Sequence, residues 1–166
     1  KAGALESDLI LAHIYQMRGN LDSSSHIIKS TIESIFELDN DTLLALAYHA
    51  LGANYQYKGS NELAVENYQK ALELNKKLNI VNESLRQYNN IGLIYREEGE
   101  YSKALEYINQ CLLLSKQAGN KVLESMSYGN TGYIFMKQGL YDKAIDRFNS
   151  VLELGTETKD DIISCI

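Results

Sequence analysis

The sequence predicts an all-helical protein, an α-solenoid built from stacked antiparallel helix pairs, and three observations support this fold class. The chain of 166 residues contains no proline, so no residue of that kind interrupts a helix from within. Apolar residues recur three or four positions apart, which is the spacing of one helix face. The third observation is that the chain repeats its own pattern at an interval of forty residues.

The forty-residue period appears when the chain is compared with itself. Three similar stretches, YHALGANYQYKG, YNNIGLIYREEG and YGNTGYIFMKQG, begin at Tyr48, Tyr88 and Tyr128. Later in each repeat, small and large sites alternate at Ala64/Tyr68/Ala71, Ala104/Ile108/Cys111 and Ala144/Phe148/Val151. We therefore divide the chain into four repeats, 1–40, 41–80, 81–120 and 121–160, with 161–166 as the start of a further repeat or a capping helix.

Each repeat is predicted to form two helices. The first helix ends at a glycine suited to the left-handed C-terminal conformation, at Gly19, Gly59, Gly99 and Gly139. Three residues later, Asp22, Ser102 and Asp142 can support the N-terminus of the second helix. The next turn is expected near Asp39–Asn40, Asn79, Gly119–Asn120 and Lys159–Asp160.

Small residues at two sites of each repeat have a steric explanation. We expect Gly92 and Ala104 to lie where the paired helices cross, because a missing or minimal side chain lets two backbones approach closely. Tyr95 and Ile108 would fill the space beside them. A glycine inside a helix costs up to ~1 kcal/mol relative to alanine, so its recurrence suggests that close packing offsets this cost.

The pattern resembles the tetratricopeptide repeat, through the aromatic, glycine and small-residue sites quoted above. The resemblance implies a right-handed superhelix in which the first helices line a concave groove that binds extended peptides or partner helices. The usual closing proline is missing, and Phe36, Lys76, Lys116 and Thr156 stand there. The longer period resembles the long-helix subtype found in cell-polarity adaptors, kinesin light chains and bacterial regulators.

The groove prediction follows from helix geometry, because positions that avoid the packed face of each first helix point inward. The residues expected to bind a partner are His13, Gln16, Met17, His49, Gln56, Tyr57, Arg86, Asn89, Asn90, Leu93, Arg96, Met126, Asn130, Tyr133, Met136 and Lys137. Glu6, Leu9, Ile10, Leu46, Ala50, Ala53, Glu97 and Gly129 complete the predicted groove wall.

Two features of this surface indicate the kind of peptide. Asn90 and Asn130 are forty residues apart, and amides in such a ladder offer both donors and acceptors to a peptide backbone. The resemblance implies the same use of asparagines. Arg86, Arg96 and Lys137 favour an acidic peptide. The alternative for both features is an open face of solvated polar residues.

Composition argues against several other classes of function. The net charge of −6 and pI near 5.1 do not suit general nucleic-acid binding. No apolar run has the length of a membrane helix. His13 and His49 are too few for a metal site, and Cys111 and Cys165 have no neighbouring ligand cluster. With no nucleophile–base pair or phosphate loop in view, we expect no catalysis, cofactor or metal.

The sequence thus predicts a non-catalytic scaffold that binds a protein or peptide. The alternative is a sensory or regulatory segment of a larger bacterial signalling protein, such as a transcription regulator, kinase or cyclase. The start at Lys1 and the apolar end at Ile162, Ile163 and Ile166 predict a longer native chain or an end-to-end homodimer. We expect a cytoplasmic location, or an extracytoplasmic one for a fragment of a membrane-bound sensor.

Overall fold

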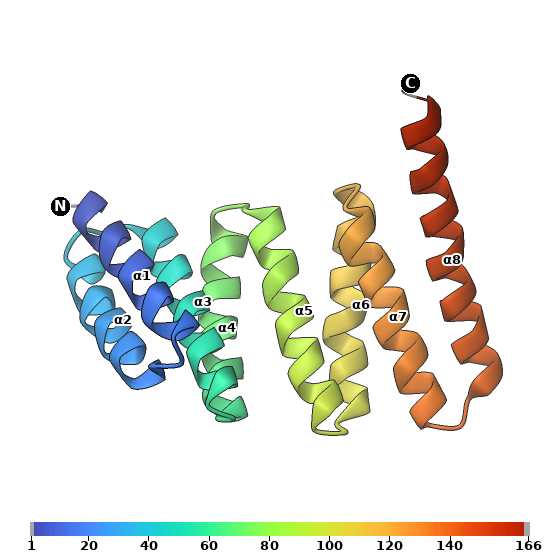
Figure 1. The fold of residues 1–166 in the computed structure, drawn as a ribbon, viewed down its shortest axis with the longest axis horizontal. Helices are drawn as coiled ribbons and strands as arrows, with labels where there is room; N and C mark the ends of the chain where they lie inside the picture. Colours follow the sequence, from blue (N-terminus) through green and yellow to red (C-terminus); the bar gives the residue numbers. More distant parts are fainter. Residues whose placement is uncertain (1, 165–166) are drawn as a thin grey trace. The chain divides into compact units, whose positions relative to one another are not determined.

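The computed structural model describes the backbone of residues 2–164 and the side chains of residues 2–156 (Figure 1). This part of the chain is entirely helical, which confirms the predicted fold class. The helices follow one another as α1 (Ala2–Met17), α2 (Leu21–Phe36), α3 (Asp41–Tyr57), α4 (Asn61–Lys77), α5 (Val81–Glu97), α6 (Tyr101–Gln117), α7 (Lys121–Lys137) and α8 (Tyr141–Ser164). None of these helices combines the length and the hydropathy needed to cross a bilayer.

The chain divides into two compact units, residues 1–87 and 88–166, with the division inside α5. In unit 1, α2 packs against both α1 and α3, and α4 packs against α3. Its core consists mainly of aliphatic side chains at helical spacing: Ala12, Ile28, Ile32, Ile35, Leu43, Leu44, Ala47 and Leu51. In unit 2, α7 packs against α6 and α8, and Ala104, Ile108 and Ile134 form a buried cluster.

Turns between the helices use residues that tolerate a positive φ. Gly59 and Gly99 have φ of 73° and 77°, as predicted for the end of a first helix. At the turns after α2, α4 and α6, Asp39, Asn79 and Gly119 have φ of 49°, 56° and 66°. Aspartate and asparagine enter this region more readily than most residues.

The expected turn at Lys159–Asp160 is not found, because α8 continues to Ser164. Lys159 occupies the position where the earlier repeats have Asp39, Asn79 and Gly119, and lysine has no such tolerance for a positive φ. Residues 161–164 therefore extend α8 rather than begin another helix. The predicted apolar end at Ile162, Ile163 and Ile166 lies outside the residues whose side chains are described.

The N-terminus of α2 is capped by Asn20, a residue that sequence reasoning did not single out. Asn20 accepts a hydrogen bond from the Ser23 backbone nitrogen at 3.2 Å, so it is the capping residue. Asn40 and Asn120 cap α3 and α7 in the same way. Asp22 lies in the first turn of α2, where a negative charge interacts favourably with the helix dipole.

Cys111 is expected to be unreactive in the folded protein. It is fully buried on α6, and burial raises the pKa of its thiol, which reduces the reactive thiolate. In a Cys165→Ser variant, an aromatic disulfide reagent should therefore modify the chain only after denaturant is added. Rapid modification of the native variant at neutral pH would contradict this burial.

Candidate functional site

The first helices of unit 1 line a cavity of about 640 Å³. Its walls come from α1 and α3, which lie beside each other in the same unit. We call it the unit 1 cavity, and it is lined by Glu6, Leu9, Ile10, His13, Gln16, Leu43, Leu46, His49, Ala50, Ala53 and Tyr57. All of these residues except Leu43 were predicted to face the groove, and the structure brings them together around one cavity.

Most of the lining of this cavity is apolar, with polar groups at a few points. Leu9, Leu43 and Leu46 offer aliphatic surface, and Ala50 and Ala53 leave room above the α3 backbone. Exposed apolar side chains on two adjoining helices are typical of a surface that binds another molecule.

The two histidines of the unit 1 cavity bind separate glutamines. His13 Nδ1 lies 3.1 Å from Gln16 Oε1, and His49 Nδ1 lies 2.9 Å from Gln87 Oε1. A carbonyl oxygen only accepts, so each Nδ1 donates. Each neutral ring then keeps Nε2 as an acceptor. The ring of His49 also packs against the ring of Tyr68, with 5.6 Å between the two ring centroids.

One donor in this cavity lacks a partner. The Nε2 atom of Gln16 is buried and makes no hydrogen bond among the described residues. Buried polar atoms are nearly always hydrogen-bonded, so this amide has unused capacity for an acceptor. Gln16 Oε1 is already occupied by His13, which leaves the amide hydrogens as the group that Gln16 offers.

In unit 2, four of the predicted groove residues come together on α5 and α7. The Arg96 guanidinium lies over the Tyr133 ring, with Cζ 5.1 Å from the centroid, and Nη1 donates to Asn130 Oδ1. Lys137 Nζ lies 5.4 Å from the same centroid. We call Arg96, Asn130, Tyr133 and Lys137 the unit 2 cluster. Both cations of the cluster are within cation–π distance of the same aromatic ring.

This arrangement changes the expected role of Asn130. Its carbonyl oxygen already accepts from Arg96, so part of its acceptor capacity is used within the chain and its amide hydrogens become the main groups that it offers a partner. Arg96 also lies 3.7 Å from Glu97, which reduces its net positive field. Lys137 is the more exposed cation of the unit 2 cluster.

The other predicted residues lie in several different places. Asn89 is buried and has little surface for a partner, which differs from the prediction. Arg86 is exposed and lies 3.7 Å from Glu83. Met126 lines a separate cavity with Leu154 of α8. The remaining predicted residues are exposed, as Met17 and Met136 are, or half-buried, as Gln56, Asn90 and Leu93 are.

Sequence reasoning missed Leu43 and Gln87. Leu43 stands one helical turn before Leu46 on the same face of α3, so helix spacing could have identified it. Gln87 orients His49 from a position where the other repeats have Ser7, Ala47 and Ser127. A large amide at a site of small residues was the available signal.

Comparison with known proteins identifies the family. A sequence profile described as Tetratricopeptide repeat matches residues 84–157, and a second profile with the same description matches residues 45–78. Together they cover more than half of the chain. The chain belongs to the tetratricopeptide repeat family. Repeats of this family generally act as non-catalytic scaffolds for protein interactions. The comparison with curated proteins found no match.

Solved structures show the same tetratricopeptide fold. MamA is 22% identical with a TM-score of 0.73, covering 94% of this chain and 81% of MamA. A signal transduction ATPase with a tetratricopeptide repeat sensor from Pyrococcus horikoshii is 23% identical with a TM-score of 0.86. Aspartyl phosphate phosphatase F from Bacillus subtilis is 18% identical with a TM-score of 0.86. The matches cover 94% and 95% of this chain but only 24% and 42% of those two proteins.

Proposed function

We propose that this tetratricopeptide repeat chain binds a partner peptide or helix whose apolar side chains enter the unit 1 cavity. The observation that supports the proposal is the cavity itself, in which aliphatic walls from α1 and α3 surround a space large enough for side chains. Apolar side chains of the partner would leave water on entering it.

The polar groups of the unit 1 cavity suit a peptide backbone. The Gln16 side chain lines the cavity with an Nε2 that has no acceptor in the described part of the chain, and a rotation of this side chain would turn that donor to a backbone carbonyl of the partner. Nε2 of His49 would supply an acceptor for a backbone N–H. Glu6 is the only charged residue in the lining. This combination favours a segment that is apolar at the cavity and uncharged or basic beside Glu6.

The unit 2 cluster favours a different contact. Lys137 and Arg96 present positive charge on α7 and α5, so we propose that an acidic residue of the partner contacts this cluster. A Lys137→Glu variant tests this contact separately from the cavity.

The test of the proposed function uses peptides selected from a displayed random library on the purified chain. Binding of the selected peptide is then measured by fluorescence anisotropy for the parent and a Leu46→Glu variant. Leu46 is 44% exposed, so the substitution leaves the core unchanged. It places a charge in the apolar cavity, and we expect at least a tenfold loss of affinity, or about 1.4 kcal/mol.

The matched control is Leu63→Glu. Leu63 is 42% exposed on α4 of the same unit, and it does not line the unit 1 cavity. This variant should bind like the parent. Equal losses in both variants, or unchanged binding by Leu46→Glu, would place the binding surface elsewhere.

A second candidate function is a sensory segment within a signalling protein. One structural match carries a tetratricopeptide repeat sensor, and this chain covers only 24% of that protein. If the coding region around this chain encodes an attached effector domain, adding the selected peptide should change the effector's activity. A coding region with repeats alone would favour the scaffold.

A further inference from the structure

The second helices of the chain carry the same apolar stripe, but its exposure differs between repeats. On α2, Ile28 and Ile32 are buried beneath α3 in unit 1. On α8, the corresponding stripe contains Ile145, Phe148 and Leu152, and Ile145 and Leu152 are 56% and 67% exposed. We call these three residues the α8 face. Phe148 also packs against Gly132 of α7, as its counterparts do within their own repeats. On α2 and α6 the stripe also meets the first helix of the next repeat, and the described residues contain no such helix after α8.

The first helix of the chain has a matching exposed surface. Leu11 and Ile14 on α1 are 43% and 44% exposed, and we call this pair the α1 face. The residues forty positions further on, Leu51 and Asn54, are buried on α3, where they belong to the side that meets α2. The α1 face is therefore the surface with which a first helix packs against a preceding second helix.

The α6–α7 junction shows that the two faces match in chemistry. In unit 2, Ile134 of α7 packs with Ala104 and Ile108 of α6, and Leu105 packs against the same cluster. At the same register, Ile14 would meet Ala144 and Phe148, with Ile145 beside them. Both sets place an isoleucine on an alanine flanked by large apolar side chains, so an α1–α8 contact would repeat a packing that the chain already uses.

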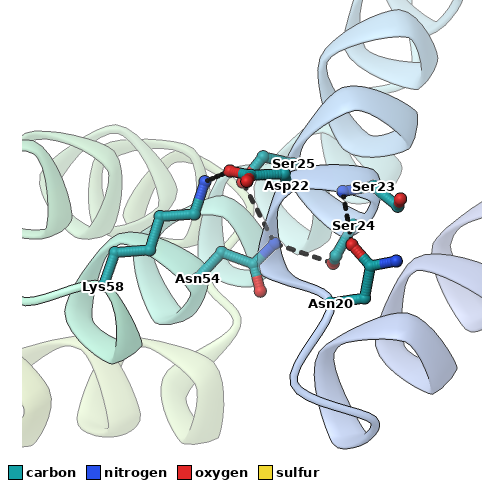
Figure 2. Close-up of polar contacts among 7 residues, drawn as sticks. All are labelled: Asn20, Asp22, Ser23, Ser24, Ser25, Asn54 and Lys58. Atoms are coloured by element: carbon teal, nitrogen blue, oxygen red, sulfur yellow. Dashed lines mark hydrogen bonds and ion pairs between the residues drawn. The ribbon is translucent and has the colours of Figure 1, made fainter.

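Charge supports the same register. At the α2–α3 junction, Lys58 Nζ lies 2.7 Å from Asp22 Oδ1 (Figure 2). The corresponding residues at the two exposed faces are Arg18, just after α1, and Asp142 on α8. Both are exposed, and neither has an ion-pair partner among the described residues. As in the α2–α3 junction, the carboxylate is on the second helix and the cation directly follows the first helix.

The α2–α3 junction in Figure 2 also contains a polar contact whose two residues are apolar at the corresponding positions of α1 and α8. Asn54 Nδ2 donates to Ser24 Oγ at 2.7 Å in unit 1. The corresponding residues are Ile14 and Ala144, which are both apolar. Where the α2–α3 junction has a hydrogen-bonded pair, α1 and α8 therefore offer two apolar residues, so the two surfaces remain complementary at this position.

We propose that the chain self-associates head to tail, with the α1 face of one copy packed on the α8 face of a second copy at the register that α3 adopts on α2. A pairing of two α8 faces would leave the α1 face uncovered and would give Asp142 no contact with Arg18. A head-to-tail contact is heterologous, so it leaves one face open at each end and forms longer assemblies or closed rings.

Analytical ultracentrifugation of the full chain tests this proposal through complementary variants. One variant carries Leu11→Glu and Ile14→Glu, and the other carries Ile145→Glu and Leu152→Glu. All four side chains are exposed in the structure, so both variants should fold, which circular dichroism will verify. The parent's average mass should rise with concentration, whereas each variant alone should remain a monomer.

An equimolar mixture of the two variants should form a complex of one copy each and no larger species. Each variant retains the face that the other has lost, so exactly one contact is possible in the pair. A monomeric parent, a monomeric mixture, or an α1 variant that still self-associates would each overturn the proposal. The last outcome would indicate pairing through α8, and a monomeric parent would assign the faces to other repeats or another protein.

A charge exchange tests the register separately from the apolar contacts. Arg18→Asp or Asp142→Arg alone should weaken self-association by about threefold, since an exposed ion pair contributes little. The variant with both changes should recover affinity because the pair is restored with opposite polarity. If both single variants associate like the parent, or if the double variant does not recover, the proposed register is wrong.

Discussion

Replacing Gly92 with leucine is expected to lower the free energy of unfolding by about 3 kcal/mol, at the upper end of typical overpacking costs. A Cβ atom at this position would lie 2.8 Å from Ile108 Cγ1 and 3.4 Å from the Ile108 backbone nitrogen. Ile108 is buried and β-branched, so its side chain has few other rotamers. The backbone of α6 would have to move away from α5. Urea denaturation followed by circular dichroism measures the loss.

The control for Gly92 is another helical glycine, Gly129 of α7. A Cβ atom there meets nothing within 4 Å. Gly129→Ala should therefore stabilise the chain by up to ~1 kcal/mol through helix propensity alone. If Gly92→Leu were tolerated as well as Gly129→Ala, the close approach of α5 and α6 would not be needed for stability.

The helix pairs could be predicted because one steric pattern recurs in repeats two to four. Gly52, Gly92 and Gly132 each face a large side chain of the following helix, namely Tyr68, Ile108 and Phe148. The spacing between the glycine and its partner is constant along the chain. Periodicity records such contacts because each repeat meets the same packing requirement.

The cavity residues could be predicted for a related reason. Ile10, Leu46 and Ala50 avoid the packed face of their helices, and helix geometry then requires them to point elsewhere. Periodicity does not show which polar side chains form hydrogen bonds with other side chains of the same chain. The contacts of Gln87 with His49 and of Arg96 with Asn130 each depend on two side-chain rotamers.

The end of α8 shows where the repeat pattern stops being informative. A forty-residue period predicts a turn at Lys159, but a turn needs a residue that accepts its backbone conformation. Asp39 and Asn79 meet that need, whereas Lys159 does not. The apolar spacing describes the packed face of a helix and carries no information about φ at its end.

Replacing Tyr68 with alanine should cost about 3–5 kcal/mol, the range for truncating a large buried aromatic side chain. Tyr68 is buried on α4, and its ring fills the space left by Gly52 on α3. Its hydroxyl donates to Gln56 Oε1 at 2.9 Å, and its ring packs against His49. The alanine variant therefore leaves a void between α3 and α4 and removes the support beneath one wall of the unit 1 cavity.

A Tyr68→Phe variant separates the ring from the hydroxyl. Gln56 is only half-buried, so water can replace the lost hydrogen bond, and the cost should be about 1 kcal/mol. Thermal and urea unfolding should rank the chains as parent, then phenylalanine, then alanine, with the larger step last. The phenylalanine variant should also keep peptide affinity at the unit 1 cavity, because the ring still supports His49. A phenylalanine variant as unstable as the alanine one would mean that the hydrogen bond to Gln56, rather than ring packing against Gly52, holds α3 and α4 together.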